Sequence, residues 1–310
     1  MEPDLLKNNV LRALLYYDIF NHPLSADELF TFFPENSVSK KEFCSLLEKV
    51  ASEESCPFAS SNGYYYIKPN VQNIELRKQK EDVSRKMWRM AGLVTHVIKR
   101  FPYVRCVLVS GSLSKNSSNK ASDIDFMIIT EQNRLWIART MLMIFKKIFL
   151  LNSYKYFCLN YYITNSHLEI EEKNIFTATE VATVKATYNT HMMRKFVNAN
   201  MWIKEYFPNY KKFDPMLHTP GCNAHERGSN MQKFIEYFFN GSFGDKLNKK
   251  FLKMTIRHWY KRYAHIDRKD RNQMFKSTEN ISKAHPHNMQ MQILNMYSDK
   301  LKEYNLGIEN

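Results

Sequence analysis

The stretch CVLVSGSLSKNSSNKASDIDFMIIT, residues 106–130, decides how this chain folds. It opens with an apolar run, Cys106 to Val109, whose length and β-branched residues predict a buried strand. A Ser-Gly-Ser turn at 110–112 ends the run, and its glycine lets the backbone turn tightly and approach a ligand closely. A second apolar run, Phe126 to Ile129, predicts another strand after a polar connection.

Two carboxylates stand at the entrance to that second strand. Side chains alternate between the faces of a strand, so Asp123 and Asp125 point the same way while Ile124 points into the opposite layer. Two neighbouring carboxylates repel each other unless a cation lies between them. Mg²⁺ suits such a pair, because it takes few protein carboxylates and completes its octahedron with water and substrate phosphate. The alternative is an ordinary hairpin with solvated aspartates. An EF-hand is excluded, because the loop lacks the central Gly and closing Glu that calcium requires.

The Gly-Ser turn facing an Asp-x-Asp strand resembles the signature of the DNA polymerase beta-type nucleotidyltransferase superfamily. The resemblance covers about the middle third of the chain and depends on Gly111, Ser112, Asp123 and Asp125. It implies that Gly111 and Ser112 bind the triphosphate of a nucleoside triphosphate. It also implies that Asp123 and Asp125 are catalytic and hold Mg²⁺ or Mn²⁺.

The same superfamily usually supplies a third carboxylate from a later strand. The matching strand here is residues 154–164, and its equivalent position is occupied by Asn160. An amide accepts a hydrogen bond but cannot act as a general base. Three other acids are candidates for the missing role, and the sequence does not choose among Glu169, Glu171 and Glu180.

Composition narrows the class of protein. The chain has 310 residues, enough for two or three domains, and a net charge of +14, which favours an anionic partner such as a nucleotide or nucleic acid. Five scattered cysteines without Cys-x-x-Cys spacing indicate a reducing cytosol and argue against a zinc site. The first ten residues lack the pattern of a secretion signal, so we expect a cytoplasmic protein.

Residues 1–70 predict three short helices and a hairpin. Ser25 to Glu28 and Ser39 to Glu42 are capping-box sequences that mark two helix starts. Asn62-Gly63 between apolar segments is a hairpin-turn signal. This order resembles a winged-helix domain, in which the third helix usually enters the DNA major groove. Such domains also serve as docking modules, and both roles stay open here.

The rest of the chain predicts further helices around the motif. Residues 71–100 read as a charged linker helix, and residues 101–190 as the catalytic domain, an α+β fold with a mixed sheet. Residues 134–151 are apolar nearly all round, but Arg139, Lys146 and Lys147 interrupt them, so a helix packed on the sheet fits better than a membrane span.

Residues 191–310 predict a mainly helical region. His218, Cys222 and His225 match no zinc spacing and indicate a loop. Residues 246–276 combine eleven Lys or Arg with interleaved aromatics, which suits either nucleic acid binding or a solvated helix whose rings face the core. His285 and His287 could bind phosphate only if they reach the cleft.

These patterns support two hypotheses. The first is a metal-dependent nucleotidyltransferase that moves a nucleoside monophosphate from a nucleoside triphosphate to an acceptor and releases pyrophosphate. The acceptor could be a nucleic acid, a protein hydroxyl or a small molecule. The second is a non-catalytic nucleic-acid-binding or regulatory protein on a degenerate fold of the same type, which Asn160 would permit.

Overall fold

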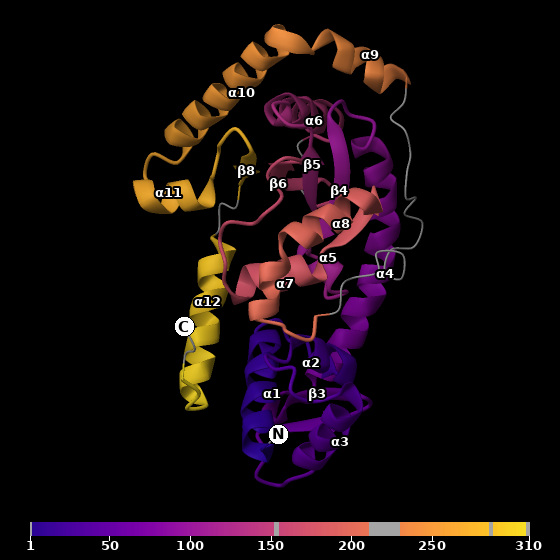
Figure 1. Cartoon of the computed structure of the whole chain (residues 1–310), viewed down its shortest axis with the longest axis vertical. Helices are drawn as coiled ribbons and strands as arrows, with labels where there is room; N and C mark the ends of the chain where they lie inside the picture. Colours follow the sequence, from indigo (N-terminus) through magenta and orange to yellow (C-terminus); the bar gives the residue numbers. More distant parts are fainter. Residues whose placement is uncertain (1, 152–154, 211–229, 285–287, 308–310) are drawn as a thin grey trace.

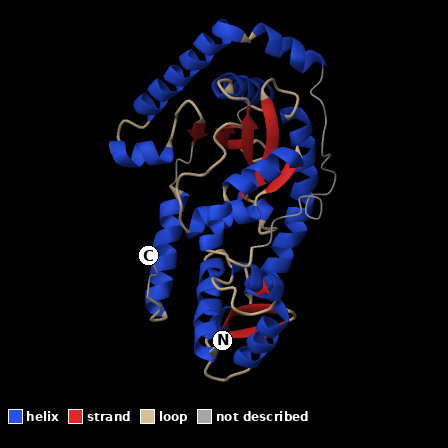
Figure 2. Cartoon of the chain, in the orientation of Figure 1, coloured by secondary structure: helices blue, strands red, loops and turns tan. Residues whose placement is uncertain are grey.

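The computed structural model describes residues 2–151, 155–210, 230–284 and 288–307 (Figure 1). These residues form a mixed α+β structure with a small antiparallel sheet and a larger mixed sheet, as the sequence predicts (Figure 2). The first part of the chain contains α1 (Pro3–Asp18), β1 (Leu24–Ser25), α2 (Ala26–Phe32), α3 (Lys40–Ala51), β2 (Phe58–Ser61), β3 (Tyr64–Ile67) and the short 3₁₀ helix η1 (Lys68–Asn70).

The predicted helices and hairpin of the first seventy residues are present. Ser25 and Glu28 form the complete capping box at α2, whereas at α3 Ser39 caps the Glu42 amide without the reciprocal bond. The turn at Asn62 and Gly63 has φ values of 53° and 80°, which join β2 and β3 as an antiparallel hairpin. β1 adds to β3, giving the order β1-β3-β2 over a core shared with all three helices.

A long helix leads into the second sheet. α4 (Asn73–Ile98) has 26 residues and therefore spans about 39 Å. Arg77 near its start is buried in an ion pair with Glu28 of α2, and Met87 and Ala91 further along belong to a core beneath the large sheet. The helix thus packs on the structure at both ends, and is less solvated than its charge predicts.

The large sheet carries the signature stretch. Its strands are β4 (Val104–Ser110), β5 (Asp125–Thr130), β6 (Cys158–Thr164), β7 (Lys185–Tyr188) and β8 (Ile281–Lys283), in the order β7-β4-β5-β6-β8. The β5 and β6 pair is parallel and the other pairs are antiparallel. Ser110 pairs with Asp125, so the end of β4 meets the start of β5.

Helices cover both faces of this sheet. One face packs against α4 and α6 (Leu135–Phe149), the helix that crosses from β5 to β6. The other face packs against α7 (Ile175–Thr183), α8 (Thr190–Ala199) and the short 3₁₀ helix η2 (Met201–Glu205). α5 (Gly111–Ser114) is a single turn directly after β4.

No helix of the described residues is long and apolar enough to span a bilayer. The apolar stretch at 134–151 is α6, packed on the sheet as expected. Two of its three cations, Arg139 and Lys146, are buried, which the sequence does not indicate.

The described residues of 191–310 are mainly helical, but the helices pack in different places. α9 (Asn230–Phe238), α10 (Gly241–Arg262) and α11 (Arg268–Met274) arch over the α6 end of the molecule (Figure 1). β8 adds an edge strand beside β6. α12 (Met289–Glu303) runs beside α1 (Figure 1). Lys300 of α12 pairs there with Asp18 at 2.7 Å.

Candidate functional site

The Gly111 turn lies directly against Asp125. Gly111 has φ +66°, a left-handed backbone conformation that other residues adopt only at a cost. A Cβ atom built on Gly111 would lie 2.5 Å from Oδ2 of Asp125. Both the backbone conformation and the approach of the carboxylate therefore require glycine at this position.

The two predicted aspartates share one side of the chain. Ile124 between them is fully buried, and its backbone N–H and carbonyl bond with Lys155 and Cys158 as in a strand. Alternation therefore puts Asp123 and Asp125 on the same face, and both line one cavity. On this face Met127 and Ile129 continue from Asp125 into the core beneath α7 and α8.

Electrostatics at the acid pair favour a bound cation. Burial, followed by the charges of Glu180 and Asp123, raises the pKa of Asp125 to about 6. A divalent cation would offset both the burial of this carboxylate and its repulsion by the neighbouring acids. Carboxylate oxygens that line a cavity are also the ligands that Mg²⁺ and Mn²⁺ accept.

Asn160 contacts the acid pair from β6. Its Nδ2 donates to Oδ1 of Asp125 at 2.7 Å, and its Oδ1 accepts from the thiol of Cys158, also at 2.7 Å. The pairing of β5 with β6 slips by one residue at this point, so that Asn160 is the extra residue of a bulge. The bulge turns the amide toward Asp125, where it orients one carboxylate oxygen but supplies no base.

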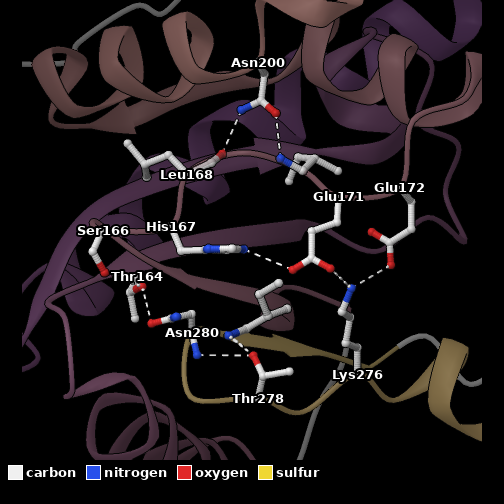
Figure 3. Close-up of polar contacts among 12 residues, drawn as sticks. Thr164, Ser166, His167, Leu168, Glu171, Glu172, Asn200, Lys276, Thr278 and Asn280 are labelled. Carbon is white, nitrogen blue, oxygen red and sulfur yellow. Dashed lines mark hydrogen bonds and ion pairs between the residues drawn. The ribbon is translucent and has the colours of Figure 1, made fainter.

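Two of the three candidate acids are engaged in the loop between β6 and α7. Figure 3 shows Glu171 between His167, at 3.1 Å, and Lys276, at 2.5 Å. Glu169 pairs with Lys173 at 2.8 Å. The Lys276 contact joins the loop to the segment that precedes β8, and the Lys173 contact lies within the loop, so both acids have structural partners.

A buried asparagine holds the other side of the same loop. Asn200 donates to the carbonyl of Leu168 at 2.8 Å and accepts from the amide of Ile170 at 2.7 Å (Figure 3). Across the loop, Thr164 donates to Asn280 at 3.0 Å (Figure 3). The loop is thus fixed before it enters α7, which carries the remaining candidate acid.

Glu180 on α7 reaches the Gly111 turn. Its Oε2 accepts from the Gly111 amide at 3.0 Å, and its Oε1 pairs with Lys115 at 2.6 Å. Lys115 also donates to the Gly111 carbonyl at 3.1 Å. A carboxylate therefore occupies one of the backbone donors that the sequence assigns to a phosphate, and a cation that sequence reasoning missed lies beside it. The sequence feature that could have indicated this role for Lys115 is its position four residues after Gly111.

Ser112 faces the same cavity and is tied to the loop that follows. Its hydroxyl lies 3.1 Å from the hydroxyl of Ser118, whose backbone amide donates to Ser84 of α4. α4 therefore supports the connection between the Gly111 turn and the acid pair.

The cavity has a volume of about 1180 Å³, enough for a nucleotide and part of an acceptor. Tyr17, Phe20 and His22 of the N-terminal unit line one side of it. His22 is 3 % exposed and its Nδ1 has no hydrogen-bond partner within the described residues. The end of α1 and the turn that follows it thus form part of the cavity wall.

Across the described ranges, no three His, Cys, Asp or Glu side chains are grouped to hold a metal. Asp123 and Asp125 would therefore supply two ligands, with the others coming from substrate and water. His218, Cys222, His225, His285 and His287 lie outside the described residues. Comparison of the chain with models of protein families, with curated proteins and with solved structures finds no match.

Proposed function

We propose that this protein is a metal-dependent nucleotidyltransferase of the DNA polymerase beta type, with a winged-helix-like N-terminal domain. The observation that carries the proposal is the contact between Gly111 and the Asp125 carboxylate, beside Asp123 and at the edge of a large cavity. A left-handed glycine packed against neighbouring carboxylates raises the free energy of the folded state. Such strain is typical of functional sites, and chemistry on a polyphosphate accounts for it here.

The residues have distinct roles in this proposal. Asp123 and Asp125 would hold Mg²⁺ or Mn²⁺, which supplies charge neutralisation for the triphosphate and its leaving oxygen. The Gly111-Ser112 backbone binds phosphate oxygens, and Lys115 adds a cation within reach of the same turn. Asn160 holds the Asp125 carboxylate in its orientation through the 2.7 Å hydrogen bond.

Before nucleotide binds, the Glu180 carboxylate neutralises the positive charge of Lys115 beside the Gly111 turn. It occupies the Gly111 amide and Lys115, the two donors nearest to the proposed phosphate position. An incoming triphosphate replaces one carboxylate by a more highly charged anion with more acceptor oxygens. The nucleotide therefore displaces Glu180 from these donors.

The proposed reaction forms one P–O bond and breaks another. An acceptor oxygen attacks the α-phosphorus and forms a new P–O bond, while the bond from that phosphorus to the bridging oxygen breaks. Pyrophosphate leaves with the electron pair, and the acceptor proton passes to solvent. Orientation of the two substrates and neutralisation of charge provide most of the acceleration.

The test is pyrophosphate release with each of the four nucleoside triphosphates in the presence of Mg²⁺ or Mn²⁺. Asp123→Asn and Asp125→Asn should each lower the rate by about a hundredfold or more, with an unchanged circular dichroism spectrum. Glu169→Gln is the matched control, since Glu169 lies at the surface, where it pairs with Lys173. Turnover that persists in both aspartate variants would refute the assignment.

A second candidate is a non-catalytic nucleic-acid-binding or regulatory protein. Asn160 in place of an acid, with no three-acid cluster in the described ranges, favours it. The exposed side of α3 carries Lys41 and Lys49 but also Glu42 and Glu48, a mixed surface for a DNA groove. Binding of DNA or RNA that falls steeply with salt, without nucleotide turnover, would support this candidate over the first.

A further inference from the structure

One face of α6 forms a wall of the cavity and carries two buried cations. Arg139, Met143 and Lys146 line the cavity and follow one another at helical spacing. The titratable group nearest in effect to Lys146 is Cys158, which pairs with Asp125 at the start of β5, followed by Asp123, so Lys146 lies toward the acid end of this wall. Seven residues of helix separate it from Arg139, a rise of about 10 Å. The cavity therefore has a second cationic region away from the acid pair.

Arg139 is buried, and no described residue supplies it with a carboxylate partner. It is 9 % exposed, and its guanidinium lies 5.5 Å from the ring of Trp136 and 5.9 Å from the ring of Trp259. Within the described ranges, no acid lies within ion-pair distance of it and no acceptor bonds to it. Burial correspondingly lowers the pKa of Arg139.

Other buried arginines in this protein are neutralised. Arg77 pairs with Glu28 at 2.8 Å and with Glu81 at 2.9 Å, and Arg134 pairs with Asp245 at 2.5 Å. Aromatic rings recover only part of the cost of burying a cation. Arg139 is therefore in an environment that a bound anion would complete.

A second donor near Arg139 also lacks a partner. The indole N–H of Trp259 is buried and has no acceptor in the part of the chain that the structure describes. Its ring is held in place by stacking on Phe275, with centroids 4.7 Å apart. A guanidinium and an indole N–H can only donate, so the ligand that satisfies them must bring acceptor oxygens with negative charge.

We propose that Arg139 and Trp259 form an anion subsite for the acceptor, which carries a phosphate or carboxylate group remote from its reacting oxygen. That the bound anion belongs to an acceptor rests on the proposed nucleotidyltransferase function. Anion binding at the subsite can be tested without nucleotide or metal. It predicts that short neutral alcohols are poor acceptors and that elongated anionic ones are good acceptors.

The experiment measures thermal unfolding of the full chain against inorganic phosphate and, separately, acetate, in the absence of nucleotide and divalent metal. Wild type should be stabilised by at least one of the two anions. Arg139→Met should raise or leave unchanged the melting temperature of the free protein and weaken the apparent affinity for that anion about tenfold or more. A larger response to phosphate than to acetate indicates a phosphorylated acceptor, and the reverse indicates a carboxylate.

Arg134→Met is the matched control, because Arg134 is equally buried but paired with Asp245. It should lower the melting temperature and keep the anion response. If Arg139→Met does not fold, Arg139→Lys replaces it, since lysine keeps the charge without the two-pronged geometry, and a reduced response is expected. A response that is absent in wild type, or unchanged in the Arg139 variant, overturns the proposal. Anion binding at Arg139 without any pyrophosphate release would leave the subsite standing and remove the transferase function.

Discussion

The requirement for glycine at position 111 can be tested by adding a single methyl group. Gly111→Ala forces a Cβ to within 2.5 Å of the Asp125 carboxylate, on a backbone with φ +66°. We expect a loss of about 1–2 kcal/mol from the backbone alone and a fall in turnover of about a hundredfold, because the carboxylate must move. Urea unfolding and pyrophosphate release measure the two effects.

Gly92 in α4 provides the matched control. Apart from the adjacent backbone of α4 itself, no atom of the described residues lies within 4 Å of a Cβ built there. Gly92→Ala should therefore stabilise the helix by about 0.5–1 kcal/mol and leave turnover unchanged. Equal behaviour of the two alanine variants would contradict the close contact at Gly111.

The raised pKa of Asp125 predicts how the free energy of unfolding depends on pH. Its pKa is raised from 3.8 to about 6, so between these values the folded protein binds more protons than the unfolded chain. Stability from this group is therefore present below pH 4 and is lost as the pH rises through about 6, by about 3 kcal/mol in all. Asp125→Asn should remove this slope and be the more stable protein at pH 7.

The measurement is the free energy of unfolding in urea at half-unit steps from pH 4 to pH 7.5. Asp299→Asn on the exposed side of α12 is the control and should keep the wild-type slope. Mg²⁺ should stabilise wild type more at pH 7 than at pH 5, because the ion competes with the proton for Asp125. A wild-type slope that survives in Asp125→Asn would contradict the assignment.

How much of this site the sequence predicts depends on how local each contact is. Strand alternation and the Gly-Ser turn are enough to predict that Asp123, Asp125 and Gly111 line one site. The pairing of Lys115 with Glu180 depends on where α7 packs, some sixty-five residues further along the chain. The orientation of Asn160 depends on a bulge, which its own sequence does not signal.

α6 begins at a cap that comes from another helix. Its N-cap residue Arg134 makes no side-chain cap bond, and instead Oδ1 of Asn248 in α10 accepts from the amides of Trp136 and Ile137, at 2.9 and 3.3 Å. Asn248→Ala leaves these buried N–H groups without an acceptor. We expect a loss of about 1–2 kcal/mol in urea unfolding.

Asn248→Asp tests the reason for that loss. It keeps an acceptor and adds a negative charge at the positive end of α6, so it should restore most of the stability. Lys249→Ala, one residue along on the exposed side, should change stability by less than about 0.5 kcal/mol. A loss in Asn248→Asp as large as in Asn248→Ala would show that packing, and not capping, is involved.

Helices and strands with strong local signals are the ones the sequence predicts. The capping box at Ser25 and the Asn62-Gly63 turn fix their own geometry, and both form as expected. β8 has only three residues and exists because the edge of β6 offers hydrogen bonds, so no local pattern indicates it. The burial of Arg139 follows from α10 covering α6, which a charge count along the sequence cannot show.

The two ends of the chain pack together, and this is the least predictable feature. Residues of α12 enter the core of the N-terminal unit, where the rings of Tyr297 and Tyr16 meet at 5.4 Å. Ile293 belongs to the same core and also lines the cavity. Almost the whole chain lies between these partners, so nothing in the local sequence of either end indicates the other. The N-terminal unit and the cavity wall are thereby coupled through α12.

This coupling predicts that a destabilising substitution in α12 also lowers the local stability of α1. Leu301 is 3 % exposed within the N-terminal core, and Leu301→Ala should cost about 2–5 kcal/mol. Hydrogen exchange should show faster exchange in both α12 and α1, because the two helices lose the same buried contact. Lys302→Ala, on the exposed side of α12, should leave exchange in α1 unchanged. If Leu301→Ala speeds exchange in α12 alone, the N-terminal unit is stable without the C-terminal helix, and α12 is an independent cover over the cavity.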